Sequence, residues 1–394
     1  ETEREVARIY QAYGKSDSFG RAEDDTAHAS TKKNREAMYA FFQKHLNNPG
    51  SSEDEVTDTL SQQDLQVTPT GQLATSLKTE TIFSLNKTHT EQLLSKLQNA
   101  RQDLNSHLKR VTQEAKYLSG YWTPLWVDKP VFTGRFQKEG YVIEKYFLKG
   151  EGDYVIPYLL LKPEHSNQKA VIYLDPSGKQ TELKDEGELV WFVKNGFTVL
   201  APDLVGQGEM GPGVFHGDSY IKGVSYNVWF ASMLVGRSIV GTRAADVVRL
   251  TRLLKRDYAP QEILALAKKD LCPVLLHAAA FDAPLDKIAL VEPYTSYSTI
   301  ALQRYYFPGF VHSLVPGALT AYDLPDLAAG FAPRKLLIVS PTDGEGDWAT
   351  AGLIDRDFSV IRRNYEVNNA VERFITSPHG ANENHYLLYE EWLK

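Results

Sequence analysis

Three residues of this chain have the types and the chain order of a hydrolytic Ser–Asp–His triad. Ser238 lies in GRSIVG, Asp343 in SPTDGEGD and His379 in SPHG. The imidazole of His379 suits general-base work, because the unperturbed pKa of histidine lies near neutrality. A carboxylate at Asp343 would orient that ring, and the hydroxyl of Ser238 would attack an acyl carbon. The sequence therefore predicts Ser238, Asp343 and His379 as catalytic residues.

Each of these residues also has a structural interpretation that the sequence leaves open. Serine is among the commonest helix N-caps, and Ser238 directly precedes a helical pattern. Asp343 begins an Asp-Gly pair, where aspartate often serves turn geometry. His379 follows the last apolar segment and precedes the closing helical pattern, which favours a functional role over that of a chance loop histidine.

The usual place for a nucleophilic serine holds no serine. In ILALAKKDLCPVLLHAAA (263–280), a strand pattern passes into a helix pattern, as in the G-x-S-x-G elbow. Lys269 stands at the serine position, and Ala267 and Leu271 replace the flanking glycines. Without glycines the strained turn is disfavoured, so we expect a relaxed elbow. The nucleophile is therefore expected one helix upstream, at Ser238.

Further residues are predicted to bind the substrate around this triad. The DPSGK loop, which follows the first crossover strand, is placed to offer backbone N–H groups to an oxyanion. The Gly-rich segment DLVGQGEMGPGVFHG and the aromatic residues beyond it would suit sugars. An arginine beside the serine could pair with a substrate carboxylate. The predicted substrate-binding residues are Arg237, Ser177, Gly178, Lys179, His216 and Tyr226.

The elements that must position these residues follow a parallel α/β pattern. Six short apolar segments end in loops, alternate with helical patterns and are predicted as strands. The segment YVIEKYFLKGEGDYVIPYLLLKP predicts an antiparallel hairpin. Together they indicate a doubly wound, mostly parallel α/β sheet whose ligands bind at the carboxyl ends of the strands. The six segments are KAVIYLDPSG, GFTVLAPDLVGQG, EILALA, KIALVEPYTSY, KLLIVSPTDG and AVERFITSPHG.

The chain divides into three predicted regions. EREVARIYQAYG, a loop with His28 and NREAMYAFFQKHL repeat the order of strand, histidine loop and helix at the chain's end. Residues 1–46 are therefore predicted to be the tail of a preceding hydrolase-type module, with an unrelated helical cap as the alternative. Residues 47–130 are expected to form a linker and a helical strut at 90–117, and 131–394 the α/β domain. Since the chain starts at Glu1, we expect a piece of a longer protein.

Composition narrows the class of partner. The net charge of −7 and the absence of basic blocks argue against nucleic acid and anionic membranes. No apolar segment approaches the length of a membrane span. The one cysteine, Cys272, is expected to be a small buried hydrophobe. No metal-spaced histidine cluster and no phosphate-binding motif occurs, so no metal and no cofactor is predicted.

Several segments together resemble the α/β-hydrolase carbohydrate esterases of the acetyl xylan esterase and pectin methylesterase type, over about residues 140–394. The resemblance implies His379 as base and Asp343 as acid. The sequence departs from the family at AKKDL, which stands where the family has G-x-S-x-G. The resemblance also implies ester hydrolysis on polysaccharides outside the bacterial cytoplasm, in a secreted or periplasmic protein. Residues 1–46 look like the end of another such domain, as in members with two modules. The segments that carry the resemblance are FTVLAPDLVGQGE, GRSIVGTRAADVVRLTRLL, LHAAAFDAPLDKIALVEPYTSY, YDLPDLAAGFAPRKLLIVSPTDG and SPHG.

Two functions follow from these observations. The first is a serine carboxylic-ester hydrolase, acting on acetyl or methyl esters of polysaccharides, with its nucleophile moved to Ser238. The second is a catalytically inactive hydrolase-like module that has a structural or carbohydrate-binding role beside an active module of the same parent protein. A hydrogen bond between Ser238 and His379 would favour the first function.

Overall fold

The computed structural model describes residues 1–211, 220–221, 224–380 and 384–394. Within these ranges the chain forms two compact units, Glu1–Glu80 and Thr81–Lys394. No described helix is both long enough and apolar enough to cross a membrane. The second unit contains the predicted triad, and its boundary at Thr81 lies well before the predicted start of the α/β domain at 131.

The first unit contains only helices and loops among its residues. Its first element is a helix and not the predicted strand, so the proposed repeat of the chain's end is wrong in this respect. Apolar residues at Val6, Ile9, Tyr10 and Tyr13 follow helical spacing. Acidic residues in the first turn also favour the helix through its dipole. The elements are α1 (Thr2–Ala12), η1 (Ser16–Ser18), α2 (Lys32–His45) and α3 (Leu73–Leu77).

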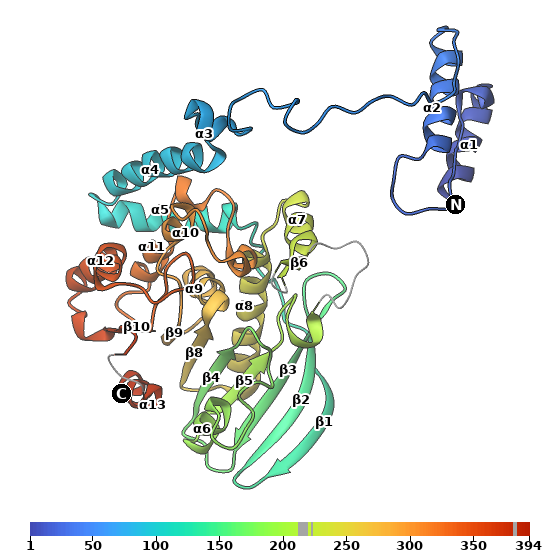
Figure 1. Ribbon diagram of the computed structural model, residues 1–394. Coiled ribbons are helices and arrows are strands. Elements are labelled where there is room, and N and C mark those ends of the chain that lie inside the picture. The colour runs from blue at the N-terminus through green and yellow to red at the C-terminus, as the bar shows by residue number, and fades with distance from the viewer. Residues whose placement is uncertain (212–219, 222–223, 381–383) are drawn as a thin grey trace. The chain divides into compact units, whose positions relative to one another are not determined.

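A mixed nine-stranded sheet, counted over the described residues, forms the centre of the second unit (Figure 1). Its order is β1-β2-β3-β5-β4-β8-β9-β10-β11, with β1, β2 and β3 antiparallel to their neighbours and the remaining pairs parallel. The predicted doubly wound fold, its six strands and the hairpin are confirmed. The strands are β1 (Val131–Lys138), β2 (Tyr141–Lys149), β3 (Val155–Pro163), β4 (Lys169–Leu174), β5 (Thr198–Pro202), β8 (Glu262–Lys268), β9 (Lys287–Val291), β10 (Lys335–Val339) and β11 (Phe374–Ser377), with a separate ribbon of β6 (Tyr220–Ile221) and β7 (Val224–Ser225).

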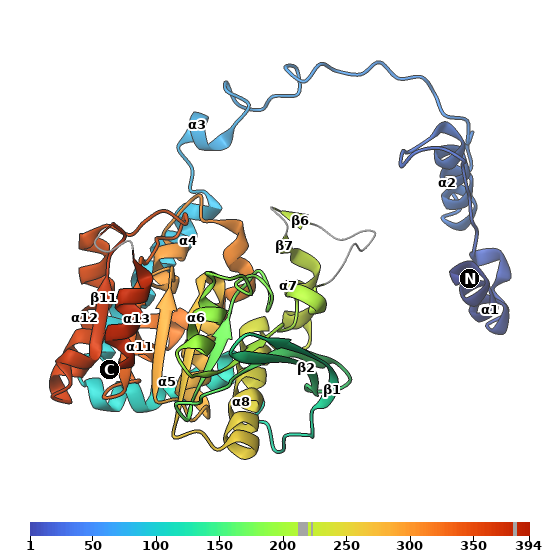
Figure 2. The same cartoon turned by 90° about the horizontal axis from the view of Figure 1, so that it is seen from below.

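Helices cover both faces of this sheet (Figure 2). Side chains of β4 alternate between two apolar cores, because successive residues of a strand point to opposite faces. Ile172 belongs to a core that includes residues of α8, α9, α11 and α12, whereas Val171 belongs to a core that includes residues of α6 and α13. The helices are α6 (Glu188–Lys194), α7 (Tyr226–Leu234), α8 (Ile239–Tyr258), α9 (Cys272–Phe281), α10 (Tyr297–Ala301), α11 (Leu324–Ala329), α12 (Ala351–Val367) and α13 (His385–Leu393), with short 3-10 helices at Gly208–Met210, Lys269–Leu271, Pro308–Ser313, Ala318–Thr320 and Val371–Arg373.

The helical strut predicted at 90–117 is two helices, α4 (Ile82–Ala100) and α5 (Leu104–Leu118). The break occurs because the Asp103 side chain caps the new helix by accepting from the Ser106 N–H. Arg101 at the break pairs with the buried Asp326 of α11, with 2.7 Å between Nε and Oδ1. These helices therefore pack on the α/β sheet unit and are not part of a linker.

Candidate functional site

The turn between β8 and α9 has a strained backbone although it contains no glycine. Lys269 has a φ of +51°, in the left-handed region that costs an L-residue about 1–2 kcal/mol. The expectation of a relaxed elbow is therefore wrong. β8 ends here, and a 3-10 turn at Lys269–Leu271 leads into α9. This reversal places the side chain of Lys269 where an α/β hydrolase would present its nucleophile.

Lys269 borders a cleft of about 510 Å³ at the carboxyl ends of the parallel strands. Its Nζ lies 3.6 Å from Oε2 of Glu292, the residue directly after β9, and its side chain is 60% exposed. Burial raises the pKa of Asp270, and the nearby Arg243 opposes that shift. The cleft combines one ammonium, three carboxylates and three aromatic rings, and is lined by Lys269, Asp270, Glu292, Phe307, Gly309, Phe310, Thr342, Glu345, Gly346 and Trp348.

His379 lies beside this cleft, stacked on one of its walls. Its ring is parallel to that of Trp348, with 3.8 Å between the centroids and 7° between the planes. His379 is exposed. Sequence reasoning missed Trp348 and Glu292. The rule that selected Asp343, an acid just after a strand, would also have selected Glu292.

Ser238 does not face the cleft as a nucleophile. It is the N-cap of α8, it is buried, and its Oγ accepts from the Gly241 N–H at 2.9 Å. The hydroxyl donates its proton to the Ser119 carbonyl at 2.8 Å. The capping interpretation of Ser238 therefore describes this structure, and a hydroxyl committed in this way has no proton to give to an imidazole.

The rest of the GRSIVG segment is also explained by packing. A Cβ at Gly241 would lie 2.2 Å from the Ser119 carbonyl oxygen, so only glycine fits there. Arg237 forms a two-pronged ion pair with Glu151, and its guanidinium lies 4.3 Å above the Trp122 ring. The predicted substrate role of Arg237 is therefore not supported, because both terminal nitrogens of its guanidinium already donate to Glu151.

Asp343 accepts hydrogen bonds within its own loop. Its Oδ1 accepts from the N–H groups of Glu345 at 2.8 Å and Asp347 at 3.1 Å. Within the described parts of the chain, no hydrogen bond joins Ser238, Asp343 and His379. The structure thus shows the three residues in separate local roles, and the carboxylate of Asp343 orders a turn.

The backbone N–H groups of the loop at 177–179 are not free to bind an oxyanion. The Ser177 N–H is bonded to Oδ1 of Asp175 at 2.9 Å, and the Gly178 N–H to its carbonyl at 3.0 Å. The Lys179 N–H is bonded to Oδ1 of Asp203 at 2.8 Å. The Lys179 ammonium is buried against Asp203 as well. The predicted oxyanion hole is therefore filled by the protein's own acceptors.

Tyr226, His216 and Cys272 are the remaining residues that the sequence singled out. Tyr226 begins α7, half-buried, with its ring edge-on to Trp229; burial raises its pKa. His216 lies outside the described residues. Cys272 is fully buried, as expected, and burial raises its pKa. The described residues contain no cluster of His, Cys, Asp and Glu that could hold a metal.

The sheet, its helices and the β8–α9 turn define the α/β-hydrolase fold. The profile of the Abhydrolase family matches residues 300–386. The structure is similar to that of a candidate acetyl xylan esterase from Bacteroides fragilis, at 17% identity and a TM-score of 0.57, over 72% of this chain and 77% of that one. It is also similar to the methylesterase BT1017, at 16% identity and a TM-score of 0.52, over 78% and 66%. A search of curated proteins finds no match.

Proposed function

We propose that this chain is a carbohydrate-esterase-like module that binds a saccharide in the Lys269 cleft without serine-based ester hydrolysis. The observation that carries the proposal is Lys269 itself. It occupies the left-handed turn where a serine would act, and it is paired with Glu292. An ammonium that is paired with a carboxylate is no nucleophile.

The composition of the cleft favours a neutral saccharide. The one ammonium of the cleft is already paired with Glu292 and is not free for a uronate carboxylate, whereas the carboxylates accept hydrogen bonds from sugar hydroxyls. Trp348, 46% exposed, offers one face to His379 and the remainder of its surface to the cleft. Aromatic rings with a wet edge are common binding surfaces. The names of the similar structures suggest xylan-derived sugars as the class to test first.

Hydrolysis of an acetyl or methyl ester in the same cleft is the second candidate function. It is favoured by the exposed imidazole of His379, which has the solvent access that a general base needs. With Ser238 buried as a helix cap, the nucleophile would have to be water. In either case we propose that the module works beside an active hydrolase module of the same parent protein, in a secreted or periplasmic setting.

Titration calorimetry with neutral and acidic xylo-oligosaccharides tests the binding proposal. Trp348→Ala should weaken binding of the neutral oligosaccharide by about tenfold, the equivalent of about 1.4 kcal/mol. Trp126→Ala is a matched control, because Trp126 is exposed and does not line the cleft. Equal losses in both variants, or tighter binding of the acidic oligosaccharide, would contradict the proposal.

Hydrolysis of a chromogenic acetate and of a methylated uronide separates the two candidates. We expect no turnover by the wild type above that of Lys269→Ala or His379→Ala. Turnover that is lost in His379→Ala and kept in Ser238→Ala would replace the binding proposal with a water-based esterase. Turnover lost in Ser238→Ala would restore the serine mechanism.

A further inference from the structure

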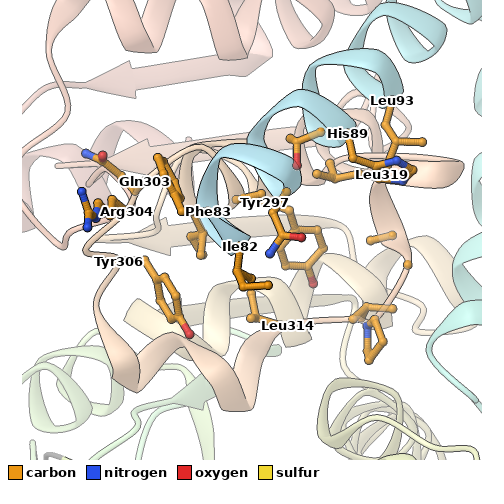
Figure 3. Close-up of a pocket in the computed structure, with 18 of the residues that line it drawn as sticks. Ile82, Phe83, His89, Leu93, Tyr297, Gln303, Arg304, Tyr306, Leu314 and Leu319 are labelled. Atoms are coloured by element: carbon orange, nitrogen blue, oxygen red, sulfur yellow. The ribbon is translucent and has the colours of Figure 1, made fainter. Parts of the chain in front are cut away.

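A second and larger cavity, of about 760 Å³, lies elsewhere in the second unit (Figure 3). It shares no lining residue with the Lys269 cleft. One side is a single face of α4, which contributes Ile82, Phe83, His89 and Leu93 at helical spacing. Its other walls come from α7, from α10 and the following loop at 303–306, and from the segment at 314–319.

The body of this cavity is apolar and aromatic. Leucine, isoleucine and methionine side chains line it together with the rings of Phe83, Trp229, Tyr297, Tyr305 and Tyr306. Cavities of about 300–1,000 Å³ with such linings are typical sites for small molecules. A flat aromatic group would match the rings that surround it.

Two polar side chains, Gln303 and Arg304, mark one end of the cavity. Figure 3 shows Gln303 and Arg304 together at one end, with His89 and Leu319 at the other. Arg304 is exposed and forms no ion pair within the described ranges.

We propose that this cavity binds an aromatic carboxylic acid. The ring would lie among the aromatic side chains, and the carboxylate would meet the guanidinium of Arg304, which suits it as a planar, two-pronged donor. The inference is independent of what the Lys269 cleft binds, since the two cavities have no residue in common.

Calorimetric titration of the full chain with cinnamate, and with cinnamyl alcohol as its neutral counterpart, tests this site. Cinnamate should bind the wild type and bind Arg304→Gln about tenfold more weakly, while cinnamyl alcohol should bind both equally. Arg110→Gln is the matched control, because Arg110 is an exposed arginine of α5 outside the cavity. No binding of cinnamate to the wild type, or equal binding to Arg304→Gln, would overturn the proposal.

A cavity-filling variant tests the location. Ala301→Phe places a ring among the lining residues and should abolish cinnamate binding; unchanged binding would overturn the assignment to this cavity. If that variant fails to fold, the Arg304→Gln comparison still decides.

Sedimentation of the wild type gives a further check. A dimer that Ala301→Phe dissociates would show that a second copy of the chain fills the cavity, and this too would overturn the proposal.

Discussion

Replacing Lys269 by alanine and by glycine tests whether the β8–α9 turn keeps its strained backbone. Both variants remove the ammonium and its contact with Glu292, so that contribution cancels when the two are compared. Only the Cβ differs between them. At a φ of +51° the Cβ of alanine is strained, whereas glycine adopts this conformation readily.

The magnitude follows from two opposing terms. Left-handed backbone costs an L-residue about 1–2 kcal/mol, and glycine loses about 0.5–1 kcal/mol more conformational entropy than alanine on folding. Lys269→Gly should therefore be more stable than Lys269→Ala by about 0.5–1 kcal/mol. Lys109, exposed within α5, provides the control. There glycine should be the less stable variant by about 1 kcal/mol, as in any helix interior.

Urea unfolding of the four variants measures this difference, provided that the m-values agree. The difference in stability between the glycine and alanine variants should change sign between positions 269 and 109. If alanine is the more stable variant at 269 as it is at 109, the turn is relaxed, and the placement of Lys269 at a nucleophile elbow is refuted.

Three further substitutions test buried groups. Ser238→Ala should lower the free energy of unfolding by about 1 kcal/mol through loss of the helix cap, without changing saccharide affinity, as denaturation and calorimetry would show. Gly241→Ala should cost more than about 2 kcal/mol, because its Cβ would meet the Ser119 carbonyl; a melting temperature equal to that of the wild type would contradict this contact. Burial lowers the pKa of His277 to about 4 from 6.5, against a raising effect of the Pro273 carbonyl. Between those pH values the unfolded chain binds more protons, so stability should rise with pH, by on the order of 3 kcal/mol in total. His277→Gln should remove this pH dependence of the free energy of unfolding. An unchanged slope would contradict its assignment to His277.

The sheet could be predicted because the local sequence of most of its strands is sufficient to identify them. Strands buried on both faces are nearly continuous apolar segments, and each of those from 168 onward ends in a loop. β1 was missed because it is an exposed edge strand with no clear alternation. The first helix was mistaken for a strand because likeness to the chain's end outweighed its helical spacing.

The site was harder to predict, because residue types alone do not determine backbone angles or hydrogen-bond partners. A turn without glycine favours a relaxed backbone, yet Lys269 lies in the left-handed region at the junction of β8 and α9. Ser238 was selected for its place before a helix, which is equally the place of a cap. Its partner, Ser119, is 119 residues away in the sequence, and no local pattern reveals it.

The carboxylate of Asp203 sets a condition for engineering serine chemistry into the Lys269 cleft. A serine introduced at 269 would supply a hydroxyl, but the Lys179 N–H would remain bonded to Asp203 and could not also donate to an oxyanion. An oxyanion site built on this loop would therefore need at least two substitutions, one at 269 and one at 203. A designer who changes position 269 alone would leave the loop donors occupied.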